Sequence, residues 1–83
     1  MTWTLYVRVF ARLRELTGSE VLDVPIPAAA TVRDVRNAVA ERWPQASGLL
    51  ANSAVAVNNE YADGEHAIQP GDEVALIPPV SGG

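Results

Sequence analysis

The stretch that decides the fold is Val74-Ala75-Leu76-Ile77-Pro78-Pro79-Val80-Ser81-Gly82-Gly83. Four apolar residues follow Glu73, which predicts a strand from Glu73 to Ile77 that is buried on both faces and lies in the middle of a sheet. Two prolines then end this strand, because proline has no N–H for a sheet ladder. We therefore expect a domain over residues 1–77 and an extended C-terminal tail over residues 78–83.

The expected tail combines a stiff stalk with a thin tip. Pro78 and Pro79 favour an extended backbone, which lowers the entropy that is lost when a partner captures the tail. Val80 and Ser81 form a small anchor, and the two glycines after them have no Cβ and can enter a channel too narrow for other side chains. These features suit a chain segment that inserts into another protein's active site. A frayed chain end is the alternative, since flexible ends also favour glycine.

The N-terminal part of the chain predicts two strands joined by a short helical turn. Residues 3–10 alternate between an apolar and a more polar face, which is typical of a half-buried strand. Residues 11–16 favour a helical turn. A second strand is expected over residues 21–26, where Pro25 and Pro27 should end it. The connection is too long for a tight turn but allows the two strands to pair antiparallel.

The main helix is predicted to begin at Thr31 and to end before Pro44. Thr31 and Asp34 have the spacing of a capping box, with aspartate in the place usually taken by glutamate. Proline disfavours helical geometry in the residue before it, so Trp43 should leave the helix. An apolar stripe at helical spacing predicts core packing on one side of the helix. Its members are Val32, Val35, Val39 and Trp43.

The remaining segments complete a mixed sheet. Residues 45–52 are either a loop or a short second helix, residues 53–57 a third strand, and Asn58-Asn59 a turn into a short strand over residues 60–62. We expect the final strand to lie in the centre of the sheet, beside the first strand. The two strands should run parallel, because the helix lies in the crossover between them. The sequence thus predicts an α+β, β-grasp fold: a sheet of four to five strands with one main helix across one face.

Composition limits the kinds of function. The 83 residues form one small domain, and there is no cysteine for a disulfide or a thiolate nucleophile. No apolar run approaches the roughly 20 residues of a membrane span, so we expect a cytoplasmic protein without a membrane partner. No lysine or arginine follows Arg42, whereas five acidic residues do. This acidic half argues against nucleic acid and suits a partner that is basic around the tail, although acidic residues also serve solubility.

No constellation of catalytic residues is evident. His66 is the only histidine and lies among turn residues, so we expect it to be an exposed loop residue rather than a metal ligand. Asp72 and Glu73 are neighbours in an extended segment and should point to opposite faces. The chain also has no phosphate-binding glycine loop. We therefore expect no enzyme activity of the chain on its own.

The residues from Pro70 to Gly83 carry a specific resemblance. Together with weaker matches at residues 10–18, 31–32 and 56–58, they make the chain resemble the small subunits of molybdopterin synthase, within the ubiquitin-like sulfur-carrier family. The Gly-Gly ending alone is shared with thiamine and other sulfur carriers and with ubiquitin. Carriers for thiamine or cysteine synthesis, and a β-grasp module that binds partners non-covalently, therefore remain alternatives.

The resemblance implies a role for each residue of the tail. A ubiquitin-activating-like adenylyltransferase would use ATP to adenylate the carboxylate of Gly83, and a sulfur donor protein would convert it to a thiocarboxylate. Gly82, Ser81, Val80, Pro79 and Pro78 would dock into the molybdopterin synthase large subunit. That subunit, in a heterotetramer of two small and two large subunits, would bind the pterin precursor, cyclic pyranopterin monophosphate, which receives the dithiolene sulfurs. No cofactor would be bound by the carrier itself.

Overall fold

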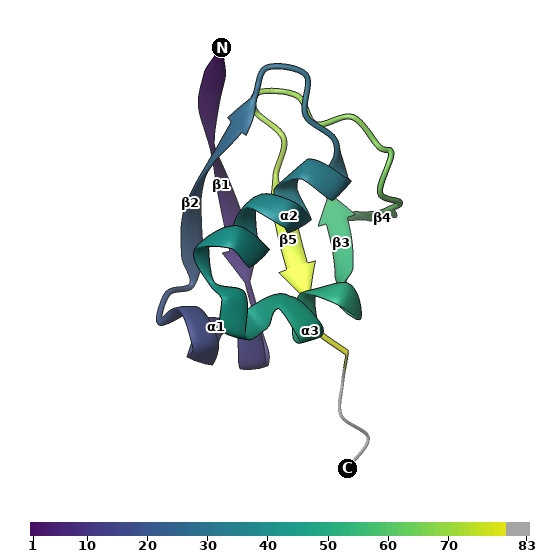
Figure 1. Cartoon of the computed structure of the whole chain (residues 1–83). Coiled ribbons are helices and arrows are strands. Elements are labelled where there is room, and N and C mark those ends of the chain that lie inside the picture. Colours follow the sequence, from purple (N-terminus) through teal and green to yellow (C-terminus); the bar gives the residue numbers. More distant parts are fainter. Residues whose placement is uncertain (80–83) are drawn as a thin grey trace.

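The structure is a computed structural model that describes residues 1–79 (Figure 1). Within these residues, two strands are each followed by a helix, and a further helical region then precedes three consecutive strands. Their bounds are β1 Thr2–Val9, α1 Ala11–Thr17, β2 Val21–Pro27, α2 Val32–Arg42, the 3-10 segment η1 Pro44–Ala46, α3 Ser47–Ala51, β3 Ala54–Val57, β4 Glu60–Ala62 and β5 Val74–Ile77. Residues 45–52, for which the sequence allowed a loop or a helix, are therefore largely helical.

The strands form one mixed sheet in the order β2-β1-β5-β3-β4. β5 pairs parallel with β1 and antiparallel with β3, so the last strand of the chain occupies the centre, as predicted. Figure 1 shows α2 lying across one face of this sheet. The predicted β-grasp arrangement, with its single main helix, is confirmed. No helix within residues 1–79 has both the length and the hydropathy to cross a bilayer.

The core lies between α2 and the face of the sheet that it covers. The predicted capping box is present: Thr31 N–H donates to Asp34 Oδ2 (2.9 Å) and Asp34 N–H donates to Thr31 Oγ1 (3.4 Å). Such a cap fixes where the helix begins and which residues turn inward. Trp43 is non-helical and half-buried, as the following proline predicts. The fully buried large side chains are Leu13, Ile26, Leu50, Leu76, Val7, Val24, Val32, Val35, Val39, Val55 and Val74.

Burial of β5 on both faces was predicted and is wrong. Val74 and Leu76 are 1% and 0% exposed, but Ala75 and Ile77 on the opposite face are only partly buried. The reason is that α2 covers one face of the sheet, while no element of residues 1–79 covers the other. We call this second face the open face. Its apolar residues in β5 therefore need an explanation other than core packing.

The predicted end of the second strand is partly wrong as well. β2 continues through Pro25, which pairs with Thr4, and ends at Pro27. This is possible because β2 is an edge strand, where the missing N–H of a proline can face away from the sheet. The neighbouring Ala28 N–H donates to Met1 O (2.9 Å), so alternate residues make the ladder bonds and the prolines fall between them.

Candidate docking face and tail

One row of residues crosses the open face through all five strands. The register of the sheet aligns Val21 with Arg8, Arg8 with Ala75, Ala75 with Ala56, and Ala56 with Tyr61. The two middle strands contribute alanines, which have almost no side chain above the sheet. Larger residues stand on either side of them. The sequence therefore builds a depression in the middle of the open face.

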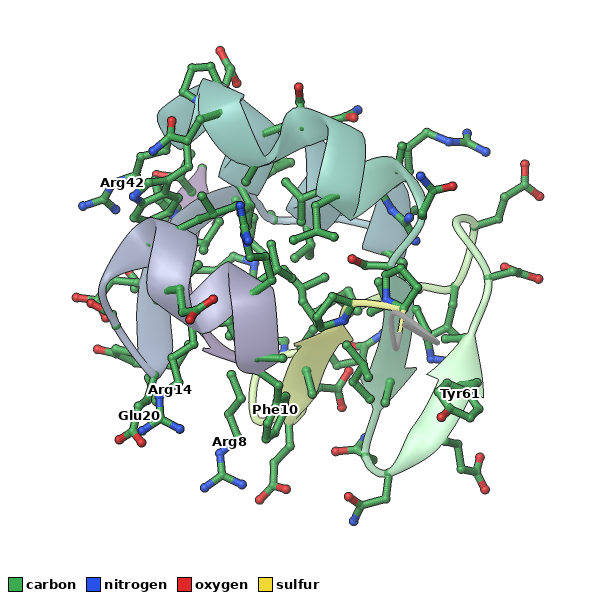
Figure 2. The ribbon with its side chains drawn as sticks, turned by 90° about the horizontal axis from the view of Figure 1, so that it is seen from below. Arg8, Phe10, Arg14, Glu20, Arg42 and Tyr61 are labelled. Carbon is green, nitrogen blue, oxygen red and sulfur yellow. The ribbon has the colours of Figure 1, made fainter. Side chains whose placement is uncertain are left out.

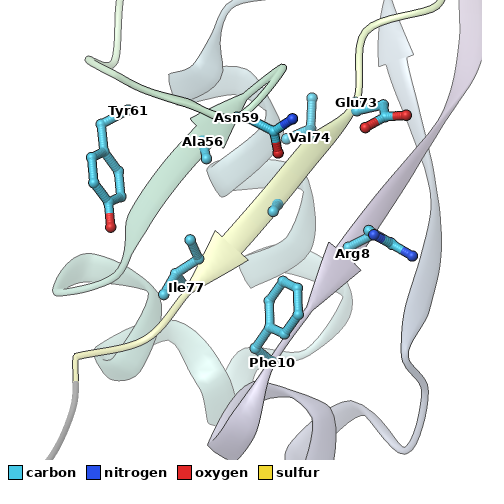
Figure 3. Close-up of a pocket in the computed structure, with 9 residues that line it drawn as sticks. Arg8, Phe10, Ala56, Asn59, Tyr61, Glu73, Val74 and Ile77 are labelled. Atoms are coloured by element: carbon cyan, nitrogen blue, oxygen red, sulfur yellow. The ribbon is translucent and has the colours of Figure 1, made fainter.

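This depression, the central hollow, has a volume of about 280 Å³. Phe10 and Ile77 line one end of the hollow, and Tyr61 lines it from β4, beyond β3 (Figure 3). Arg8 and Glu73 line its charged side. Figure 2 shows Arg8, Phe10 and Tyr61 on the side of the sheet away from α2. Phe10 is 43% and Tyr61 78% exposed. Exposed aromatic side chains around an apolar hollow are typical of a protein-binding surface.

The start of β5 is fixed by a turn that is distant in the sequence. Asn58 and Asn59 have φ angles of 52° and 69°, which is the geometry of a tight hairpin turn between β3 and β4. The Asn58 side chain donates to Asp72 Oδ1 (3.0 Å) and accepts from Glu73 N–H (2.9 Å). Its backbone N–H donates to Glu73 O (2.8 Å). The sequence predicted the turn but not that Asn58 holds the strand leading to the tail.

Asp72 belongs to the same network. Its Oδ2 accepts from Gln69 N–H (2.7 Å) and its Oδ1 from the Asn58 side chain. Hydrogen bonds from Gln69 and Asn58, in that order, lower the pKa of the Asp72 carboxyl, because they stabilise its charged form. Glu73 instead lines the central hollow. Both residues also line a second hollow on the open face, so the predicted placement of Asp72 and Glu73 on opposite faces is wrong. The reason is that both precede β5, where strand alternation does not yet apply.

The other end of β5 delivers the chain to the tail. Leu76 pairs with Val9 on one side and Val55 on the other, and Ile77 pairs with Ala54. Pro78 is buried and Pro79 is exposed. The remaining predicted site residues lie outside the described residues: they are Val80, Ser81, Gly82 and Gly83. What the structure establishes is that the last strand before them is held on both sides.

His66 and the acidic side chains are the other residues within 1–79 that could bear chemistry. His66 is exposed in the segment between β4 and β5, as predicted. Residues 1–79 contain no cluster of three or more histidine, aspartate or glutamate side chains placed to hold a metal ion. The sequence did not single out Arg8, Phe10 and Tyr61. A signal was available for two of them, since the alternation of residues 3–10 places Arg8 and Phe10 on the face away from Val7 and Val9.

Comparison with known proteins identifies the family. The ThiS family model matches residues 7–83, and the chain belongs to this family. The molybdopterin synthase sulfur carrier subunit of Arabidopsis thaliana is 35% identical, covering 93% of this chain and 80% of its own. That of Escherichia coli is 38% identical, covering 93% and 96%. The crystal structure of SAMP1 from Haloferax volcanii has a TM-score of 0.84 and 34% identity, covering 98% and 100%.

Proposed function

We propose that this protein is the sulfur carrier subunit of a molybdopterin synthase. The observation that carries the proposal is that β5, paired on both sides, leads directly into residues 78–83, and that the family match continues through residue 83. Relatives from Arabidopsis thaliana and Escherichia coli carry this name over most of their length. Because β5 is paired on both sides and Pro78 is buried, the start of the tail is already held by the domain before a partner binds.

The chemistry is assigned to the carboxylate of Gly83. The sequence has no cysteine, so no side chain can hold the sulfur as a persulfide. A carboxylate is a poor electrophile, and an adenylyltransferase would activate it with ATP, releasing pyrophosphate. The terminal sulfur of a donor protein's persulfide then attacks the carbonyl and AMP leaves. A thiol cleaves the S–S bond of the resulting acyl persulfide, which leaves a thiocarboxylate on Gly83 and a disulfide. Because activation consumes ATP, we place it in the cytoplasm.

The open face and the tail would act together on the large subunit. In this proposal Phe10, Tyr61 and Ile77 dock against the large subunit, while residues 78–82 enter its active site. The thiocarboxylate sulfur forms a C–S bond at an oxygen-bearing carbon of the pterin precursor, and the oxygen on that carbon leaves. Water then hydrolyses the acyl–sulfur bond, which returns the carboxylate of Gly83 and leaves the sulfur on the pterin. Two carriers on a dimer of large subunits would supply the two dithiolene sulfurs. The catalytic residues would belong to the large subunit.

The test follows the mass of the intact protein. After incubation with the activating enzyme, ATP and a persulfide donor, we expect the mass change of one oxygen replaced by sulfur, localised to the C-terminal peptide. The thiocarboxylated protein should then yield dithiolene product with the large subunit and precursor. A variant lacking Gly82 and Gly83 should still bind the large subunit but give no product. Full product formation by that variant would refute a carrier role.

A protein modifier is the second candidate. The Haloferax volcanii relative is named small archaeal modifier protein 1, is 36% identical, and matches along the whole of both chains. Both candidates need an activated terminus but differ in the acceptor, which is a lysine amine for a modifier. Covalent conjugates on other proteins after activation, without dithiolene synthesis in the reconstituted reaction, would favour the modifier. A thiamine or cysteine pathway carrier would give neither outcome with these partners.

A further inference from the structure

We propose that Arg8 determines the specificity of docking by pairing with a carboxylate on the large subunit. The inference rests on the proposed function and adds to it the chemistry of the partner surface. Arg8 lies on the open face of the sheet rather than in the tail.

Arg8 lies on β1, at the side of the central hollow. It lines the central hollow and two hollows that adjoin it. The first, of about 330 Å³, lies toward Tyr6 and Asp72, and the second, of about 190 Å³, lies toward Arg14 and Glu20. Its neighbour in β5 is Ala75, which is too small to cover the guanidinium. A partner that fills any of these hollows therefore meets Arg8 (Figure 3).

Several other arginines are already engaged within the domain. Arg14 forms an ion pair with Glu20. Arg36 donates to Leu50 O (2.8 Å) and Ser53 O (3.1 Å). Arg42 donates to Asp23 O (2.8 Å) and lies over the Trp43 ring, with 4.8 Å from its guanidinium carbon to the ring centroid.

Arg8 differs from these arginines. Within residues 1–79 its guanidinium makes no hydrogen bond or ion pair, although Glu73 lines two of the same hollows. The side chain is exposed, so water satisfies its five N–H donors in the free protein. Arg8 is thus available to a partner without the loss of an internal contact.

Docking on the open face would remove that water. A guanidinium buried without an anionic partner is costly, whereas a carboxylate can accept two parallel hydrogen bonds from it. This geometry makes arginine a frequent centre of binding energy in interfaces. Glu73, beside Arg8 on the same face, predicts a basic group next to that carboxylate on the partner. The pair of opposite charges would fix the orientation in which the two subunits meet.

The experiment measures binding of the unmodified carrier to the large subunit of the same organism by titration calorimetry. Arg8→Gln keeps the length of the side chain without its charge, and we expect about a tenfold or greater loss of affinity. Arg8→Glu places like charges together and should lose about tenfold more. Arg33→Glu is the matched control for charge, because Arg33 is exposed on α2, at the covered face of the sheet. It should bind within about twofold of wild type.

Salt provides an independent measurement. Added salt should weaken wild-type binding more than it weakens Arg8→Gln, because screening acts on the charge pair. Equal losses for Arg8→Glu and Arg8→Gln, with equal salt dependence, would overturn the carboxylate assignment while leaving the proposed function intact. An equal loss for Arg33→Glu would show a general charge effect and also overturn it. Failure of the wild type to bind any large subunit would instead count against the proposed function.

Discussion

The two faces of the five-stranded sheet use the same strands for different purposes. Along β1, Leu5, Val7 and Val9 face α2 and are 0–2% exposed. Tyr6 and Arg8, which alternate with them, lie on the open face, where Tyr6 is 62% exposed. Strict alternation lets one strand fill the core and present a binding surface at once. Stability and recognition can therefore be changed separately by substituting neighbouring residues.

The sharpest test of this separation uses two adjacent residues of β5. Leu76→Ala should lower the free energy of unfolding by about 3 kcal/mol, because Leu76 is fully buried and truncation leaves a cavity. Ile77→Ala, on the open face, should cost about 1 kcal/mol or less but weaken docking. Urea denaturation measures both. Similar losses in the free energy of unfolding for the two variants would contradict the separate roles of the two faces.

The aromatic residues of the open face should show the converse effect. We expect Phe10→Ala and Tyr61→Ala each to weaken binding to the large subunit by about tenfold or more, since aromatic side chains are frequent centres of binding energy. Because both are exposed, each should change unfolding by about 1 kcal/mol or less. Calorimetric titration gives the affinity. Asn37→Ala, an exposed change on α2, is the control and should bind as wild type does.

The turn network that holds β5 should stabilise the folded protein less than the core does, and its contribution to the free energy of unfolding should depend on pH. Asp72→Asn should lower the free energy of unfolding at neutral pH by about 1 kcal/mol, a value reduced because the network is exposed to solvent.

The sign of the pH effect follows from the direction of the pKa shift. The pKa of Asp72 in the folded protein is lowered from the ordinary 3.8, so its stabilisation is present above that value. It is lost as the pH falls through the folded pKa. Urea denaturation across acid pH should therefore show the wild type and Asp72→Asn converging. Glu60→Gln, at an exposed residue of β4, should match wild type at neutral pH. A constant gap between wild type and Asp72→Asn at all pH values would contradict the role of the carboxylate.

Local signals explain why much of the fold is predictable from the sequence. The alternation of residues 3–10, the cap formed by Thr31 and Asp34, and the proline at position 44 each act within a few residues. The central place of β5 followed from its apolar run. The same apolar run led to the wrong prediction that β5 is buried on both faces, because the sequence does not reveal that no layer within residues 1–79 covers the second face of the sheet. An apolar residue such as Ile77 looks the same in a core and on a docking surface.

The open face itself depends on contacts that no local pattern specifies. The central hollow exists because Ala56 and Ala75 become neighbours only when β3 pairs with β5. Asn58 fixes the start of β5 across a separation of 14 residues to Asp72. Each of these residues is unremarkable in sequence and acquires its role through strand register. The predicted tail residues 80–83 stay predictions.

The smallest expected effect concerns the point where β1 leaves the open face. Ala11 has a φ of 51°, and this left-handed backbone turns the chain between exposed Phe10 and buried Leu13. This conformation costs an L-residue about 1 kcal/mol or more, whereas glycine adopts it without that cost. Because glycine also loses more entropy on folding, Ala11→Gly should raise the free energy of unfolding by only about 0.5 kcal/mol. Ala40→Gly, within α2, should lower it by about 1 kcal/mol. If both variants lose stability equally in urea denaturation, Ala11 is not strained, and the turn that holds Phe10 on the open face needs another explanation.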